Sequence, residues 1–217
     1  MPSRHEQREI DRVWSSCLRP DIVVERLQTR HGYSHQVSID AMSKTPDDAP
    51  FVPLDLAVLT VSDSRTEADD TSGDFLRDAA LDRGHRIVAK EICRDDPYRL
   101  REVFSRWIAD PDIRVVISTG GTGITGRDST PEAVIPLFDK PIDGFGELFR
   151  QLSFEEIGAS TIQSRAVAGL ANATLIFCLP GSTGACRTAW ERILGPQLDS
   201  RTKPCNFAQL IARFDER

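Results

Sequence analysis

The sequence lacks the features that would take the chain into or across a membrane. No apolar run in its 217 residues approaches the ~20 that a membrane-spanning helix needs. No apolar stretch of about 7–15 residues follows a basic N-terminus, as a secretory signal peptide requires. Both absences predict a cytoplasmic protein that has no membrane partner.

Paired cysteines, clustered histidines and an excess of basic residues are also missing. The five cysteines form no C-x-x-C pair and only His85 lies beyond residue 41, so we expect neither a disulfide framework nor a zinc site. The formal net charge is −6, whereas neutralising nucleic-acid phosphates takes clustered Lys and Arg in excess. The charge balance therefore argues against a nucleic-acid partner.

What is present suffices for one domain with an appendage, since a domain averages ~150 residues and 40% of this chain is hydrophobic. Residues 1–41 are predicted to be an N-terminal extension, disordered or weakly helical, without which the domain still folds and works. Residues 42–53 are rich in Pro and Asp, which indicates a linker. Residues 54–213 are then expected to form the domain.

Within that domain, segments with a strand pattern alternate with segments with a helix pattern. Four largely apolar segments predict strands: Leu56–Val61, Arg86–Ile92, Ile113–Thr119 and Thr174–Leu179. Helices are expected to begin at 70–72 and end at 84, and to span 96–108, 130–138, 144–157, 160–170 and 183–194. The alternation predicts an α/β domain whose mostly parallel sheet is covered on both faces. Ligands bind beyond the carboxyl ends of such strands, so the loops that follow them are the candidate site.

The loop after the third predicted strand has the strongest signal for ligand binding. It has the sequence Thr119-Gly-Gly-Thr-Gly-Ile-Thr-Gly-Arg-Asp-Ser-Thr-Pro-Glu132. Its glycines allow positive φ and a close backbone approach, and consecutive exposed N–H groups form a concavity that binds anions. Ser129 or Thr130 would cap a helix that begins at Pro131, with its positive end toward the same space. A plain turn is the alternative, although a turn needs only one or two glycines.

Gly121-x-Gly123-x-x-Gly126 also matches the dinucleotide-binding pattern. In that motif the last glycine lies in the first helical turn, whereas Ser129-Thr-Pro131 places the helix start later. The acid expected ~20 residues on, at the end of a strand, is missing because Phe138–Asp143 has no strand pattern. No G-K-[ST] follows, so a P-loop is excluded. A nicotinamide-dependent oxidoreductase therefore stays an alternative with little support.

Asp128 is the residue that says most about the ligand. A carboxylate repels phosphate in the same loop, since two unit charges ~4 Å apart cost roughly 4 kcal/mol at an effective dielectric of about 20. A divalent cation between them reverses the sign, so Asp128 indicates Mg²⁺ shared with phosphate oxygens. The sequence equally allows Asp128 to cap the following helix or to pair with Arg127, and both alternatives stay open.

The other loops carry polar groups as well. Asp95 and Asp96 precede a helix, and with Asp96 as its cap, Asp95 is available to a ligand. The first loop contains Ser62-Asp63-Ser64-Arg65, and the fourth, Leu179-Pro-Gly-Ser-Thr-Gly-Ala185, is a second candidate for anion binding. Ser164-Arg165 offers a hydroxyl and a guanidinium that suit a phosphate, unless the pair is only a solvated helix face.

Several of these segments resemble the MogA/MoaB family of molybdenum cofactor biosynthesis. The similarity lies in motifs that occur in the family's order: Thr119-Gly-Gly-Thr-Gly123, Arg127-Asp-Ser-Thr-Pro-Glu-Ala133, Gly144-Phe-Gly-Glu147, Gln163-Ser-Arg165 and Leu179-Pro-Gly-Ser182. Further segments resemble the MoaB branch: Phe149–Gly158, Ala185–Glu191 and Lys203–Phe207. The resemblance spans about residues 54–210. It implies a three-layer α/β/α fold that binds molybdopterin, a pterin with a dithiolene and a terminal phosphate.

The resemblance also implies a reaction, the transfer of AMP from Mg-ATP to the molybdopterin phosphate with release of pyrophosphate. It implies that Asp128 and Asp95 are catalytic and bind the metal, Mg²⁺. The residues implied to bind molybdopterin are Thr119, Gly120, Gly121, Thr122, Gly123, Ser164, Arg165, Pro180, Gly181 and Ser182. Those implied to bind the nucleotide are Ser62, Asp63, Glu132, Gly144 and Glu147.

Two features of the motifs bear on whether the chain is active. Arg127, Asp128 and Thr130 are retained, whereas some MoaB-branch sequences alter this segment. Ser182-Thr183 replaces a Pro-containing turn that many MogA-branch members have. We therefore expect a molybdopterin adenylyltransferase and keep a non-catalytic molybdopterin-binding or carrier protein as the alternative. The resemblance further implies a homo-oligomer, either a trimer or a hexamer.

Overall fold

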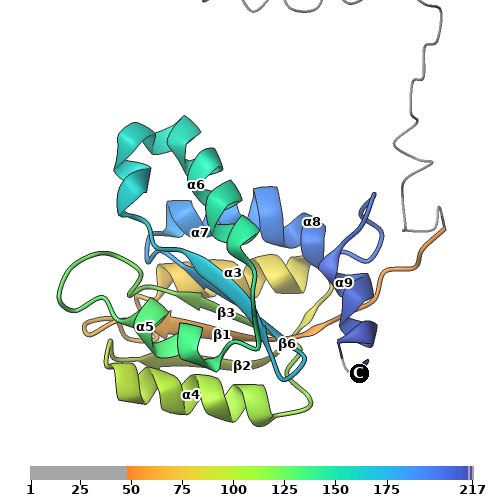
Figure 1. Cartoon of the computed structure of the whole chain (residues 1–217), viewed down its shortest axis with the longest axis horizontal. Coiled ribbons are helices and arrows are strands. Elements are labelled where there is room, and N and C mark those ends of the chain that lie inside the picture. The colour runs from red at the N-terminus through yellow and green to blue at the C-terminus, as the bar shows by residue number, and fades with distance from the viewer. Residues whose placement is uncertain (1–47, 215, 217) are drawn as a thin grey trace, which may run out of the picture. The chain divides into compact units, whose positions relative to one another are not determined.

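A six-stranded sheet with helices on both faces forms the centre of the fold (Figure 1). The computed structural model describes residues 48–214 and 216; the predicted extension, 1–41, and residues 42–47 of the predicted linker lie outside them. The strand order is β2-β1-β3-β6-β5-β4. The first four strands in this order are parallel, and β5 and β4 are each antiparallel to the preceding neighbour. The predicted three-layer α/β/α fold with a mostly parallel sheet is confirmed.

Strands and helices alternate along the first half of the domain, as the sequence pattern predicts. This half consists of β1 (Asp55–Val61), α3 (Thr71–Asp82), β2 (Arg86–Cys93), α4 (Pro97–Ala109) and β3 (Val115–Thr119). The second half is more irregular and consists of α5 (Thr130–Val134), η2 (Ile135–Leu137), β4 (Lys140–Pro141), α6 (Asp143–Ile157), η3 (Gly158–Gln163), β5 (Val167–Ala171), β6 (Thr174–Leu179), α7 (Thr183–Ala189), η4 (Trp190–Leu194), α8 (Gly195–Leu198), α9 (Phe207–Leu210) and η5 (Ile211–Arg213).

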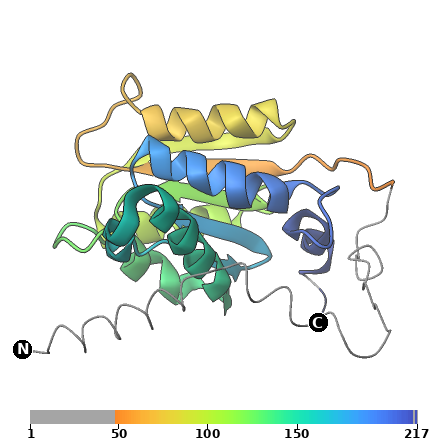
Figure 2. The same ribbon diagram turned by 90° about the horizontal axis from the view of Figure 1, so that it is seen from above.

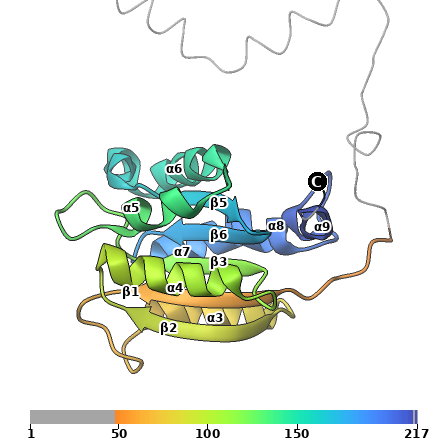
Figure 3. The same cartoon turned by 60° about the horizontal axis from the view of Figure 1, so that its bottom comes forward.

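Strands β1, β3 and β6 are buried on both faces because each faces two hydrophobic cores, whereas β2 at the edge of the sheet is only partly covered. In β1, Leu56 and Val58 pack into the core that includes α3, α6 and α7, whereas Ala57 and Leu59 pack into the core that includes α4 and α5. Figure 2 shows α3 (yellow) and α7 (blue) side by side. Figure 3 shows α4 covering the opposite face of the sheet. Alternating contact with two cores explains why the strand sequences are continuously apolar.

Helices α3 and α4 begin where the capping signals predict. Asp70 caps α3 by accepting a hydrogen bond from the N–H of Gly73, and Asp96 caps α4 by accepting from the N–H groups of Tyr98 and Arg99. Each cap pairs backbone donors of the first turn that have no partner within the helix. Since Asp96 is the cap, the neighbouring Asp95 side chain is directed elsewhere.

The predicted helix over residues 160–170 is wrong. Residues 158–163 form a 3₁₀ helix, η3, and Val167–Ala171 form β5, which pairs antiparallel with β6. Asn172 and Ala173, which connect the two strands, have φ values of 45° and 63°. Two successive residues with positive φ form a hairpin turn whose twist matches the strands. Asn-Gly is the usual sequence signal for this turn, but this chain has Asn-Ala. Without the turn signal, the apolar residues before it fit a helix as well as a strand.

A second difference concerns Phe138–Asp143, for which no strand is expected. Lys140 and Pro141 form the short edge strand β4, which pairs with Leu170 and Gly169 of β5. β4 is a strand only because it pairs with β5. Since residues 160–170 are expected to be helical, the sequence gives no partner strand for Lys140 and Pro141.

The end of the predicted linker contacts the domain. The N–H of Val52 donates to Oγ of Ser200 (2.8 Å), and the Ser200 hydroxyl donates to the carbonyl of Pro50 (2.6 Å). The Phe51 ring lies 5.2 Å from the His85 ring. Residues 50–52 therefore pack on the domain ahead of β1. Among the described helices, none combines the length and the apolar character needed to span a bilayer.

Candidate functional site

A cleft of about 540 Å³ lies at the carboxyl edge of the sheet, beyond β1, β3 and β6. β1 leads into α3 on one face of the sheet and β3 leads into α5 on the other, so their loops diverge and leave space between them. The walls opposite these loops come from α6 and η3. Among the described residues, the only charged side chains that line the cleft are Arg65 and Asp128.

Gly120 and Gly121 bring the backbone of the β3 loop close to its neighbours. Their φ values are 107° and 64°, in the region that side chains other than glycine rarely adopt. A Cβ on Gly120 would lie 2.1 Å from the carbonyl oxygen of Val61. The N–H of Gly120 donates to Leu179 (2.9 Å), and its carbonyl accepts from the hydroxyl of Thr130 (3.0 Å). The loop is thus joined to β1, β6 and α5 at once, which a plain turn does not require.

The Asp128 carboxylate lies at this glycine-rich loop. Its Oδ2 accepts from the N–H (2.8 Å) and the hydroxyl (2.7 Å) of Thr125, and lies 2.7 Å from the position that a Cβ on Gly123 would take. Burial raises the pKa of Asp128, but the hydrogen bonds from Thr125 and the backbone of Gly123, together with the charge of Arg165, hold the pKa below its ordinary value. Asp128 is therefore ionised at neutral pH.

Neither structural alternative for Asp128 is seen. Arg127 pairs with Asp63 (3.3 Å) instead, and Ser129 occupies the N-cap position of α5. The side chain faces the cleft, where the sequence places an anionic ligand.

Asp95 lies on the other side of the same loop. Its Oδ1 accepts from the N–H (3.1 Å) and the hydroxyl (2.6 Å) of Ser129, and its Oδ2 lies 2.5 Å from where a Cβ on Gly121 would be. Burial raises the pKa of Asp95, and the charges of Asp128 and Asp63 raise it further, against the lowering effect of the bonds from Ser129. Asp95 does not line the cleft itself.

The two carboxylates suit a cation that the ligand helps to bind. They lie against glycines two positions apart in the chain. No group of three or more His, Cys, Asp or Glu side chains among residues 48–214 converges as a metal site. Mg²⁺ typically takes one or two carboxylates and completes its shell with phosphate oxygens and water. The pair therefore fits Mg²⁺ that arrives with a phosphorylated substrate.

Arg165 stabilises the loop rather than facing the cleft. Its Nε donates to the carbonyl of Gly123 (2.7 Å), one terminal nitrogen donates to the carbonyl of Asp128 (3.1 Å), and the other pairs with Glu132. Because Arg165 uses its donors on these three partners, the structure gives it a role in holding the loop and not in binding a phosphate. Ser164, the preceding residue, does line the cleft.

The cleft brings together most of the residues predicted to bind molybdopterin. All of that set except Arg165 line it: Thr119, Gly120, Gly121, Thr122, Gly123, Ser164, Pro180, Gly181 and Ser182. Of the residues predicted to bind the nucleotide, Ser62 alone lines it. Asp63 forms an ion pair with Arg127, and Glu132 forms one with Arg165. Glu147 lines a separate pocket of about 650 Å³ beside α6 and β5. Gly144 lines neither pocket.

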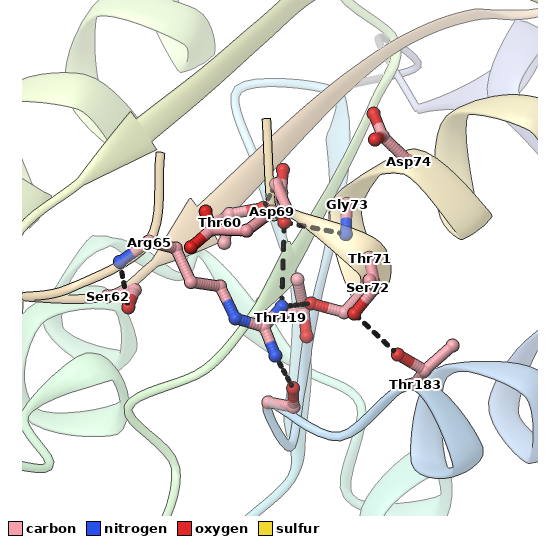
Figure 4. Close-up of polar contacts among 12 residues, drawn as sticks. Thr60, Ser62, Arg65, Asp69, Thr71, Ser72, Gly73, Asp74, Thr119 and Thr183 are labelled. Atoms are coloured by element: carbon pink, nitrogen blue, oxygen red, sulfur yellow. Dashed lines mark hydrogen bonds and ion pairs between the residues drawn. The ribbon is translucent and has the colours of Figure 1, made fainter. Parts of the chain in front are cut away.

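Arg65 lines the cleft although its sequence context predicts no role for it. Figure 4 shows its side chain extending from the loop after β1 toward Ser72, at the start of α3. It donates to Ser72 Oγ and to the carbonyl of Gly181 (3.2 Å). The signal that could have found it is its position four residues after a buried strand. Phe149 and Ile157 of α6, which add an apolar wall, were also missed.

Comparison with known proteins gives concordant results. Residues 57–200 match the family described as a probable molybdopterin binding domain. Molybdenum cofactor biosynthesis protein B of Escherichia coli K12 is 61% identical over 157 residues, which cover 72% of this chain and 92% of that protein.

Solved structures agree with the sequence relatives. A crystal structure of molybdenum cofactor biosynthesis protein B superposes with a TM-score of 0.66 at 41% identity, covering 68% of this chain and 92% of that chain. The tungsten cofactor synthesizing protein MoaB from Pyrococcus furiosus superposes with a TM-score of 0.57 at 37% identity, covering 66% and 91%.

Proposed function

The chain belongs to the molybdopterin-binding family of molybdenum cofactor biosynthesis, in its MoaB branch, and from this membership we propose that it adenylylates molybdopterin with Mg-ATP. The observation that carries the proposal is the position of Asp128. An ionised carboxylate lies against a glycine-rich loop whose backbone suits anions. This combination suits a phosphorylated ligand that brings a divalent cation with it.

In the proposed reaction, an oxygen of the molybdopterin phosphate attacks the α-phosphorus of ATP. The bond from that phosphorus to the oxygen bridging to the β-phosphorus breaks, and pyrophosphate leaves. The backbone N–H groups of the glycine-rich loop orient the phosphates and stabilise the charge that develops on them. Mg²⁺, when bound, supplies neutralisation of the phosphate charges.

Asp128 and Asp95 act as ligands of the cation rather than as bases. A phosphate nucleophile is already ionised near pH 7, so no side chain needs to remove a proton. The hydrogen bonds from Thr125 and Ser129 hold one oxygen of each carboxylate and fix the direction of the other. Fixed ligands keep the reacting phosphates aligned, which contributes to the rate through orientation.

A non-catalytic molybdopterin-binding or carrier protein is the second candidate. It is favoured by the fact that the cleft collects the residues predicted to bind the pterin but, of those predicted to bind the nucleotide, only Ser62. The two candidates differ in one measurement. The enzyme releases pyrophosphate from Mg-ATP when molybdopterin is supplied, whereas a carrier binds molybdopterin and releases none.

Replacement of Asp128 by Asn tests the assignment of the site. We expect pyrophosphate release to fall at least about 100-fold, because removing a group that stabilises transition-state charge has effects of this size. Molybdopterin binding, measured separately by fluorescence titration, should change little. Asp112→Asn, which removes the same charge from an exposed position before β3, is the matched control. Equal loss of binding and turnover in Asp128→Asn would contradict the metal-ligand role.

The proposed assembly is a homo-oligomer, trimer or hexamer, as the family resemblance implies. α6 and η3 expose apolar side chains that an assembly would bury, among them Phe154 and Ile162, which are 59% and 81% exposed. The proposed location is the cytoplasm, where molybdopterin and ATP would both be substrates.

A further inference from the structure

Arg65 is the one cationic side chain among the described residues that line the cleft. Its guanidinium lies where three elements meet: the loop after β1, the start of α3 and the loop after β6. It donates to Ser72 Oγ in α3 and to the carbonyl of Gly181 after β6 (Figure 4). These contacts hold the guanidinium at the cleft instead of letting it extend into solvent.

The contacts leave donor groups for a ligand. A guanidinium has five N–H groups in a planar fork, and the hydrogen bonds to Ser72 and Gly181 use two of them. The side chain is 28% exposed, so the cleft reaches it. Arginine forks match the oxygens of a phosphate in geometry and charge.

Behind Arg65 lies a buried carboxylate, Asp70, which is fully excluded from solvent. Asp70 accepts from the hydroxyl of Thr60 and from the N–H of Gly73 (3.0 Å). It also pairs with Lys90 of β2 at 2.8 Å and with Arg65 at 3.6 Å. Burying a carboxylate without partners is very unfavourable. This set of contacts therefore fixes the Asp70 side chain and restrains Arg65 and Lys90, which pair with it.

Lys90 shares the buried carboxylate with Arg65. It is the nearer of the two cations that contact Asp70 and also contacts Asp74 at 3.1 Å. The ion pair of Asp70 with Arg65, at 3.6 Å, is the longer of the two, and the guanidinium keeps N–H groups that a ligand in the cleft can reach. The arrangement differs from an ordinary surface ion pair, in which both charges are solvated.

We propose that Arg65 binds a phosphate group of the ligand, and that the buried Asp70 is a positioning residue that holds its guanidinium at the cleft. The inference rests on the proposed function only in taking the ligand to be phosphorylated. The phosphate belongs either to the nucleotide or to the pterin. Both sources present the same chemistry to the guanidinium, so the experiment must separate them.

Binding of two matched ligand pairs to the full chain tests the role of Arg65. The pairs are AMP with adenosine, and 6-hydroxymethylpterin monophosphate with 6-hydroxymethylpterin, measured by calorimetry without turnover. In Arg65→Met we expect the phosphorylated member of one pair to bind about 10- to 100-fold more weakly, as loss of a charge-assisted pair predicts. Its unphosphorylated partner should change less than about twofold. The affected pair identifies which substrate carries the phosphate.

Arg77→Met is the matched control, because Arg77 lies on α3, pairs with Asp74 and Asp78, and does not line the cleft. It removes the same charge and should leave both pairs unchanged. The inference is overturned if wild type shows no preference for the phosphorylated member of either pair. It is also overturned if Arg65→Met weakens both members of a pair equally.

The role of Asp70 is tested by a double-mutant cycle. Asn retains a side-chain oxygen that caps α3 at Gly73 but lacks the charge. Asp70→Asn should weaken the phosphorylated ligand about 3- to 10-fold, and should add nothing when Arg65 is already Met, since coupled residues are not additive. Equal weakening of both members of a pair, or additive effects in the double variant, would assign Asp70 a merely structural role.

These measurements separate the inference from the proposed reaction. Selective loss of phosphate binding in Arg65→Met, together with absence of pyrophosphate release in wild type, would retain the phosphate site and reject adenylylation. If Arg65→Met still releases pyrophosphate and its binding of the phosphorylated ligands is unaltered, adenylylation is retained and the phosphate site at Arg65 is rejected.

Discussion

Single residues set the shape of the cleft, and Gly120 contributes most directly. Its positive φ and its approach to Val61 leave no room for a side chain. The sequence pattern predicts the glycine-rich loop and positive φ within it. Which glycine needed it could not be predicted, because the constraint at Gly120 comes from β1, some 60 residues earlier in the chain.

Replacing Gly120 by Ala should therefore destabilise the protein by about 2–3 kcal/mol, because the strained φ and the clash with Val61 add. Gly126→Ala is the control in the same loop, since a Cβ there meets nothing within 4 Å. It should change the free energy of unfolding by less than about 0.5 kcal/mol. Urea unfolding of both variants measures the difference, and equal effects would contradict this account.

His85 makes a second residue-scale prediction, through pH. It is 3% exposed, and its Nδ1 accepts from the N–H of Leu54 (3.2 Å). Burial lowers its pKa to about 4, and this effect outweighs the raising effect of the Asp199 charge, while the Arg83 charge adds a smaller lowering. The folded pKa lies below the ordinary value of 6.5, so folding requires the neutral ring.

The stability that depends on neutral His85 is complete above pH ~6.5 and is lost as the pH falls toward 4. We expect wild type to lose about 2 kcal/mol more than His85→Gln between pH 7 and pH 4.5, because Gln does not titrate. Denaturant unfolding at the two pH values measures this. Parallel losses in both proteins would show that the imidazole stays uncharged or is solvated.

At the scale of elements, local signals were sufficient where they were strong. Capping residues and apolar spacing placed α3 and α4 correctly, because helix formation there depends on contacts within a few residues. The β5–β6 hairpin was missed because its turn contains no glycine. Its strand character depends on pairing with β6 and β4 rather than on its own periodicity.

Ala173 tests the account of the hairpin. Its φ of 63° is unfavourable for a residue with a Cβ, so Ala173→Gly should stabilise the protein by about 1 kcal/mol. Ala168→Gly, in the interior of β5 where φ is negative, should instead destabilise it by a similar amount. Thermal unfolding of the two variants compares them. Loss of stability in Ala173→Gly would indicate that the turn conformation is not strained.

At the scale of the whole molecule, the boundary of the domain lies earlier than the linker prediction suggests. Residues 50–52 contact Ser200 and His85, so they stabilise the fold. Deleting residues 1–41 should leave the melting temperature and molybdopterin binding unchanged. Deleting residues 1–53 should lower the melting temperature by several degrees, because contacts of about 1–2 kcal/mol are lost. A large effect of the shorter deletion would show that the extension is not dispensable.

The sequence alone determined the class of fold, the position of the loops that follow the parallel strands, and the motifs that indicate a phosphorylated ligand. These follow from local composition: apolar runs, caps and a glycine-rich loop. Only the tertiary structure decided that Asp128 faces the cleft, that Arg165 stabilises the loop and that Arg65 is held beside a buried Asp70. The physical reason is that the direction of a polar side chain depends on partners from distant segments, and a sequence does not show which partners folding brings together.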